Sequence, residues 1–149
     1  MNLTEQENRH CIDVCNSLLR GELSAIEVYS QVNHKYPDEP ETTSLRHIRD
    51  EHIWAVGRLR TNIQEMGGEP DTDSGAWGNV AKSVQGAANL FGENSAICSL
   101  EQGEKHGRNE YEDALEDEGV MADCKLMIRT ELLPKIDQHI HTLEQLGKS

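Results

Sequence analysis

Aromatic residues and strand-like patterns are scarce in this sequence. Among its 149 residues are one Phe, three Tyr and two Trp, and no segment alternates β-branched with polar residues. A β-sheet would therefore have little to build on. A chain of this length is expected to bury one core, so we predict a single all-α domain over residues 1–149.

Long apolar runs are also lacking. None approaches the roughly 18 residues that a membrane-spanning helix needs. Residues 1–7 have neither the basic segment nor the apolar segment of a secretory signal. We therefore expect a cytoplasmic protein without a membrane partner.

Basic residues are few compared with acidic residues. The chain has 14 Lys and Arg residues against 27 Asp and Glu residues, for a net charge of −13. Nucleic acid is excluded as a partner, because phosphate binding needs a clustered basic surface. An acidic surface does tolerate cations.

The four cysteines do not form a C-x-x-C pair, so neither a zinc knuckle nor a thioredoxin-type motif is indicated. We expect them to be buried, reduced thiols. They are Cys11, Cys15, Cys98 and Cys124.

Helical periodicity and end signals divide the chain into four long helices. The first is predicted to begin at Thr4, with Glu7 completing a capping box, and to run to about residue 34. Asp38 and Glu41 form a second capping-box pattern, for a helix that reaches residue 66 before two glycines.

The second half of the chain has two further long helices. One follows a cap at Asn94 or Ser95 and runs to about residue 117. The other covers about 121–146, and we expect Pro134 to kink it. A turn-rich segment and a short helix over about 77–91 should form a long crossover, which would let the second and third long helices run parallel.

Ionisable residues interrupt or flank the apolar stripe of every long helix. A lone buried carboxylate costs several kcal/mol, so such groups are normally paired or bound to a cation. Inward carboxylates and imidazoles are typical ligands of di-iron and di-manganese proteins. The candidate metal ligands are Glu22, Glu51, His52, Glu104 and His139.

A satisfied polar layer without metal is the alternative. Tyr29 and Tyr111 lie on the same stripes and could donate hydrogen bonds to the carboxylates. His47 and His106 fall off the stripes and are expected at the surface.

Four short segments resemble ferritin-like iron proteins. Residues 18–29 (LLRGELSAIEVY) resemble the first helix of bacterioferritins, where Glu22 falls on an iron-ligand glutamate. Asp50-Glu51 followed by Ala55 resembles the second helix, Gly103-Glu104 the third-helix glutamate of rubrerythrins, and Gln138-His139-Ile140 the closing E-x-x-H. The resemblance implies that Glu22, Glu51, Glu104 and His139 are metal ligands.

Two family ligands are missing. Trp54 stands where the second-helix histidine belongs, and Ile136 stands where the fourth-helix glutamate belongs. His52 or Asp137 could substitute from a neighbouring position. The remaining set could hold one divalent ion, an asymmetric pair of ions, or none.

Over nearly its whole length the chain resembles a bacterial family of ferritin-like four-helix bundles described only as a domain of unknown function. The resemblance rests on the G-G-E-P turn at 67–70, the Trp-containing crossover, the E-Q-G-E and Y-E-D-A-L patterns within 101–115, and E-L-L-P at 131–134. It implies a ferritin-like four-helix bundle and no established reaction.

Three functions remain open, and the sequence leaves undecided whether the protein is an enzyme. The first is an iron or manganese protein that reacts with oxygen or peroxide. The second is a non-enzymatic stress-response or assembly protein in which Trp54 and Ile136 fill a vacated metal site. The third is a helical module whose acidic exterior binds a basic protein. A homodimer packing through Val28, Ile53 or Trp54 fits the first two functions.

Overall fold

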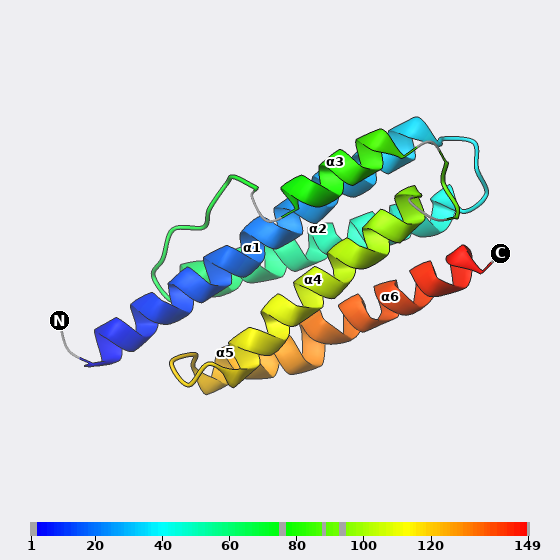
Figure 1. The fold of residues 1–149 in the computed structure, drawn as a ribbon. Coiled ribbons are helices and arrows are strands. Elements are labelled where there is room, and N and C mark those ends of the chain that lie inside the picture. Colours follow the sequence, from blue (N-terminus) through cyan, green and yellow to red (C-terminus); the bar gives the residue numbers. More distant parts are fainter. Residues whose placement is uncertain (1–2, 75–76, 88, 93–94, 149) are drawn as a thin grey trace.

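A computed structural model describes residues 3–74, 77–87, 89–92 and 95–148. Four long helical rods lie side by side (Figure 1). The first three are α1 (Leu3–Lys35), α2 (Thr42–Glu65) and α4 (Ala96–Glu116), and a short α3 (Gly78–Gly86) lies in the crossover. The fourth rod consists of α5 (Ala122–Met127), the π-helical segment η1 (Ile128–Leu132) and α6 (Leu133–Gly147). The predicted all-α four-helix bundle with a helical crossover is confirmed.

The crossover sets the direction of the rods. In Figure 1, α2 and α4 run the same way, whereas α1 and α6 run in the opposite direction. The segment between α2 and α4 carries the chain back along the bundle, as we predicted from its length.

The helix ends agree with the sequence in part. The Ser95 side chain accepts a hydrogen bond from the Cys98 backbone N–H and caps α4, whereas Asn94 lies outside the described residues. Gly67, with φ of 83°, follows the end of α2 in a conformation that favours glycine. The first helix begins one residue before Thr4, whose side chain is not among the described ones.

The capping box predicted at Asp38 and Glu41 is wrong. Glu41 is the N-cap residue of α2, but it has αR backbone geometry and its side chain makes no capping hydrogen bond. The Thr42 hydroxyl instead donates to the Tyr36 carbonyl oxygen at 2.5 Å and joins the turn to the helix start.

We predicted a kink at Pro134, and the structure has a π-helical turn just before this residue. Pro134 lies in the first turn of α6, directly after η1. Proline has no N–H for the helical ladder, and a π turn is one way for the chain to continue around the missing bond.

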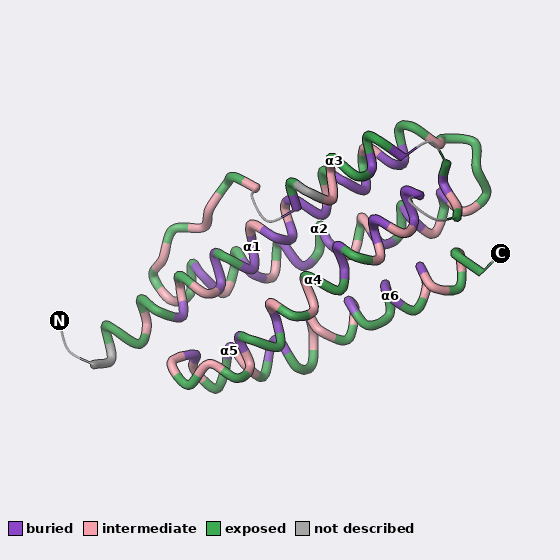
Figure 2. The backbone as a smooth tube through the Cα atoms, in the orientation of Figure 1, coloured by how far each residue is buried: buried purple, intermediate pink, exposed green. Residues whose placement is uncertain are grey.

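Two apolar clusters fill the bundle, one toward each end. Buried faces of the long helices point toward one another along its whole length (Figure 2). One cluster includes Leu19, Leu59 and Ile128, and the other includes Ile48, Leu100 and Leu143. Glu22, His52, Glu104 and His139 belong to neither cluster, although all four are buried.

The crossover helix α3 packs on α1 and α4 and covers part of the second cluster. Val28 is 1% exposed as a result, so the prediction that it lies on an outer dimer face is wrong. Ile53 and Trp54 do lie at the surface, and the homodimer itself stays a prediction.

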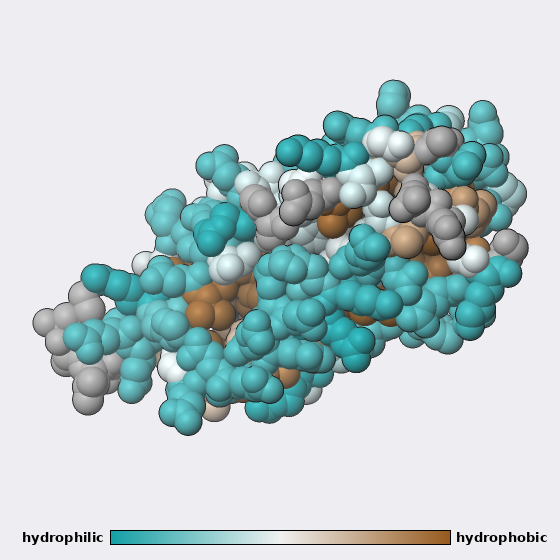
Figure 3. Space-filling model, in the orientation of Figure 1, coloured by the Kyte–Doolittle hydropathy of each residue, from teal (hydrophilic) through white to brown (hydrophobic). Residues whose placement is uncertain are grey.

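Hydrophilic residues cover most of the face drawn in Figure 3. Among the described helices, none is long and apolar enough to cross a membrane.

Candidate metal centre

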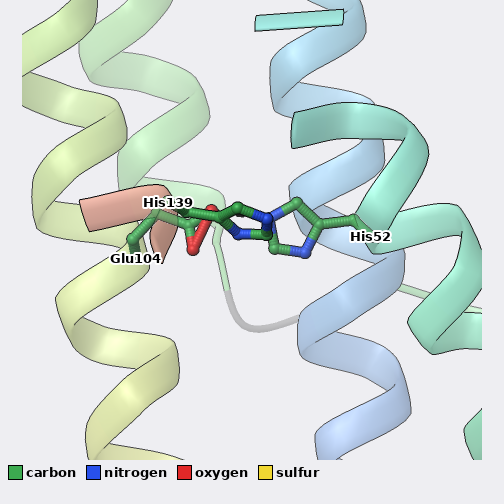
Figure 4. Close-up of side chains that lie close together, drawn as sticks. All are labelled: His52, Glu104 and His139. Carbon is green, nitrogen blue, oxygen red and sulfur yellow. Dashed lines mark hydrogen bonds and ion pairs between the residues drawn. The ribbon is translucent and has the colours of Figure 1, made fainter. Parts of the chain in front are cut away.

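Three buried side chains from three rods converge at the middle of the bundle. His52 from α2, Glu104 from α4 and His139 from α6 point toward one another (Figure 4). One nitrogen or oxygen atom of each lies within 4.8 Å of the others. This spacing allows one metal ion to contact all three residues.

On one side of the centre, His52 bridges two carboxylates. Its Nδ1 lies 2.5 Å from Glu22 Oε2, and its Nε2 lies 2.5 Å from Glu104 Oε1. The Tyr111 hydroxyl donates to Glu22 Oε1 at 2.8 Å. We call Glu22 and His52 the inner arm, because both side chains are at most 5% exposed.

On the other side, His139 pairs with a carboxylate near the surface. Its Nε2 lies 3.1 Å from Glu51 Oε1, and the Lys135 ammonium donates to Glu51 Oε2 at 3.1 Å. The Glu51 side chain is 21% exposed and lines a surface depression with Trp54 and Gln138. We call His139 and Glu51 the outer arm.

The carboxylates shift the protonation of the centre. Burial alone would lower the pKa of His52, but the charges of Glu104 and Glu22 raise it to about 10. Burial alone would raise the pKa of Glu104, but His52 and His139 lower it to about 2. In the absence of metal, His52 is therefore an imidazolium held between two carboxylates at neutral pH.

Tyrosine hydroxyls complete the polar layer. Tyr29 donates to Glu104 Oε1 at 2.9 Å, in addition to the bond from Tyr111 to Glu22. Burial and the adjacent carboxylates raise the pKa of both tyrosines well above the ordinary value, which keeps the hydroxyls protonated as donors. Both tyrosines thus make the kind of hydrogen bond that the alternative of a satisfied polar layer expects.

Two buried polar atoms at the centre lack a hydrogen-bond partner among the described residues. They are Glu104 Oε2 and His139 Nδ1, and the latter lies 3.3 Å from Glu104 Oε1. A cavity of about 10 Å³ lies on the Glu104 side of the centre, lined in part by His52, Glu104 and Ile136. Buried polar atoms are seldom left unpaired, so two of them at one centre fit a bound ion or water.

The structure brings all five predicted ligands into one network: Glu22, Glu51, His52, Glu104 and His139. His52 occupies the inward position on α2. Asp137, the other candidate substitute, instead pairs with Arg108 and is exposed. His47 and His106 are exposed as predicted, although His47 Nε2 lies 3.4 Å from Glu51.

Trp54 and Ile136, the two residues at positions where the resemblance leads one to expect ligands, behave differently. Ile136 is buried and lines the cavity, as expected of a side chain that fills a vacated position. The prediction that Trp54 does the same is wrong, because Trp54 is 44% exposed and its ring lies 4.8 Å from the Lys135 ammonium. Trp54 points outward because His52 takes the inward position two residues earlier.

Trp77 is a contributor to the site that sequence reasoning missed. It precedes α3, is buried, and places its ring centroid 6.1 Å from that of His52. A Cβ atom at Gly103 would lie 2.7 Å from the Trp77 ring, so only glycine next to Glu104 admits this ring. In the sequence, the glycine directly before Glu104 was the one signal that a large side chain packs against the helix at this point.

A solved structure has the same fold. It is described as a crystal structure of ferritin-like, diiron-carboxylate proteins from Bacillus anthracis str. Ames. The TM-score is 0.73 with 18% sequence identity, over 98% of this chain and 99% of the other. At this identity the likeness shows a ferritin-like fold and nothing of function. No curated protein sequence matches.

The family profile of a domain of unknown function, DUF2383, matches residues 10–117. The match extends from α1 through the crossover to the end of α4, and so includes Glu22, His52 and Glu104. The chain therefore belongs to the DUF2383 family.

Proposed function

We propose that this protein binds one divalent transition-metal ion, with iron(II) the foremost candidate and manganese(II) the next. The ligands are His52 Nε2, the Glu104 carboxylate and His139 Nδ1. The observation that carries the proposal is the pair of unpartnered buried atoms, Glu104 Oε2 and His139 Nδ1, at a centre where one donor atom each of His52, Glu104 and His139 lies within 4.8 Å of the others. A bound cation would give both atoms a partner.

The donor set also supports iron. Two imidazoles and one carboxylate suit divalent iron, and such a set leaves coordination positions open. When bound there, iron would supply one-electron chemistry with oxygen or peroxide. The solved structure with the same fold is described as a diiron-carboxylate protein.

In this proposal Glu22 and Glu51 orient the ligands. Each histidine turns one nitrogen toward Glu104 and the other toward a carboxylate, Glu22 for His52 and Glu51 for His139. Metal-bound histidines commonly donate their second N–H to a carboxylate, which fixes the ring and makes its free nitrogen a better ligand. Direct ligation by Glu22 or Glu51 stays a prediction from the resemblance.

The residues fit one ion better than two. A dinuclear centre of the ferritin-like class uses four carboxylates. By the sequence resemblance, Ile136 stands at one of the four positions, and it is buried. Glu22 already accepts bonds from Tyr111 and His52, and Glu51 Oε2 accepts from Lys135. The cavity of about 10 Å³ has room for about one water-sized species.

Metal content provides the test. Chelator-treated protein is loaded anaerobically with ferrous, manganous or cobaltous ion, desalted, and measured by elemental analysis. We expect one ion per chain, and a cobalt absorption spectrum typical of mixed nitrogen and oxygen ligands. Glu104→Gln and His139→Gln should lose the ion while circular dichroism remains helical.

His106→Gln is the matched control, since His106 is exposed and pairs only with Glu110 among the described contacts. It should retain full metal binding. Wild-type protein that stays metal-free after loading, with an unchanged melting temperature in excess metal, would exclude the proposal.

A metal-free bundle without enzymatic activity is the second candidate, and the bridging position of His52 favours it. An imidazolium between Glu22 and Glu104 already supplies a positive charge to both carboxylates. Under this function the loading experiment yields no stoichiometric metal, and His139→Gln changes neither metal content nor the helical signal.

A further inference from the structure

Two cysteines from opposite ends of the sequence meet inside the bundle, away from the metal centre. Cys15 on α1 and Cys124 on α5 are 109 residues apart, and their sulfur atoms lie 3.2 Å from each other. Both side chains are buried. Two sulfurs at this distance need approach by only about 1 Å to reach the length of a disulfide bond.

A polar side chain is directed at this pair. The Asn62 side-chain amide, from α2, donates to Cys15 Sγ at 3.4 Å and reaches Cys124 Sγ at 3.9 Å. An amide donor stabilises negative charge on a sulfur atom. Three rods therefore meet at the pair.

The two thiols have different proton affinities. The hydrogen bond from Cys15 lowers the pKa of the Cys124 thiol against the effect of burial, and Asn62 and the positive charge of Arg58 lower it further. The same hydrogen bond and burial raise the pKa of Cys15. These directions favour Cys124 as the sulfur that carries negative charge and Cys15 as the proton donor in their contact.

We propose that Cys15 and Cys124 form a peroxide-sensitive dithiol site that closes into a reversible disulfide linking α1 to α5. The proposal does not depend on metal binding at the candidate centre. Neither cysteine belongs to that network, and hydrogen peroxide is the named oxidant.

The reaction balances in two steps. The Cys124 thiolate attacks one oxygen of hydrogen peroxide, the O–O bond breaks, and a sulfenic acid forms while the leaving hydroxide takes up the proton that the thiol released. The Cys15 sulfur then attacks the Cys124 sulfur, the S–O bond breaks, and water leaves with the Cys15 proton. Two thiols lose two electrons, and the peroxide is reduced to two molecules of water.

Cys11 is a matched control within the same helix. It lies one turn before Cys15 and is also buried. Its sulfur accepts a hydrogen bond from the Met121 N–H at 3.0 Å and lies 3.5 Å from the Gly119 carbonyl oxygen. These backbone contacts hold the Cys11 sulfur toward the loop before α5, whereas Cys15 faces Cys124.

The test is to treat the folded, full-length protein with hydrogen peroxide, block the remaining thiols with an alkylating agent, and map the product by mass spectrometry. The expected product has lost two hydrogen atoms, contains a peptide linking Cys15 to Cys124 within one chain, and returns to four free thiols with dithiothreitol. Because the closed loop is long, its melting temperature should rise by at least about 5 °C.

Variants separate this site from general oxidation. Cys11→Ser and Cys98→Ser should still form the link. Cys15→Ser should not, and should leave a sulfenic acid on Cys124 that dimedone captures. Wild-type protein that keeps four free thiols, or that links a different pair or two separate chains, would overturn the proposal.

Discussion

His52 and His139 have the same arrangement of partners but very different surroundings. Each places one nitrogen next to Glu104 and the other next to a second carboxylate. The inner arm is sealed from solvent, with Tyr111 behind Glu22 and Trp77 beside His52. The outer arm ends at Glu51, which lies beside Lys135 at the surface. The comparison teaches that the same pattern of partners can lie wholly inside the bundle, as in the inner arm, or reach the solvent, as the outer arm does at Glu51.

The two arms should differ most in the stability that is lost when the carboxylate charge of each is removed. Glu22→Gln leaves the buried His52 with one carboxylate and should lower the free energy of unfolding by about 3 kcal/mol. Glu51→Gln should lower it by less than about 1 kcal/mol, because solvent screens that pair. Urea unfolding of both variants in metal-free buffer measures the difference. Equal losses would mean that burial does not distinguish the arms.

A side chain at Gly103 should displace the Trp77 ring that covers the inner arm. Gly103→Ala places a methyl group 2.7 Å from the Trp77 ring and should cost about 2 kcal/mol. Gly57→Ala is the control, since α2 has open space there, and it should stabilise the protein by about 0.5–1 kcal/mol. Thermal unfolding and tryptophan emission check both. An unchanged emission spectrum in Gly103→Ala would contradict the role of Trp77 as a cover.

The pH dependence of stability should sharpen the comparison in the metal-free protein. The pKa of His52 is raised from 6.5 to about 10, so its stabilising charge is fully present below pH 6.5 and is lost as the pH rises toward 10. The stability difference between wild type and His52→Gln should therefore shrink over this range by more than about 1 kcal/mol.

On the outer arm the pH dependence of stability has the opposite sign. Burial works against the shift, but Lys135 and His139 lower the pKa of Glu51, so its contribution is present above the ordinary pKa and is lost in acid. Urea titrations of wild type, His52→Gln and Glu51→Gln across the pH range separate the two contributions. A constant difference for His52→Gln between pH 6.5 and 10 would show that His52 is not held as an imidazolium.

The smallest expected effect is at the outer end. Lys135→Met removes a half-exposed ion pair with Glu51 and should change the free energy of unfolding by less than about 0.5 kcal/mol. It also removes positive charge near the centre, so cation affinity should rise by roughly two- to fivefold at low ionic strength. Calorimetric titration with manganese measures this change, and weaker binding would mean that Lys135 serves mainly to orient Glu51.

The sequence predicted the inward residues because helical periodicity decides which side chains face the core. Glu22, His52, Glu104 and His139 lie on stripes with a period near 3.6, and all four are buried. Their partners were harder to predict, since pairing across helices depends on the relative height and rotation of the rods. The tyrosines were foreseen only as available donors, without assignment to particular carboxylates.

The predictions were wrong in two situations. One relied on a family pattern instead of helical periodicity, and the other involved a helix face that the crossover covers. The second function puts Trp54 inside because a histidine stands there in bacterioferritins, although the apolar stripe itself favours His52 as the inward residue. Val28 was placed outside because nothing in its own helix shows that α3 will cover it. The pairing of Cys15 with Cys124 depends on where α5 lies against α1, which local sequence does not encode.

The position of Trp77 makes its intrinsic fluorescence a probe of the candidate metal centre. Its ring lies near His52 and is shielded from water, whereas the only other tryptophan, Trp54, is exposed. The two should therefore emit at different wavelengths, with Trp77 at the shorter one. A paramagnetic ion at the centre would quench the short-wavelength component, so occupancy could be followed by fluorescence without any label.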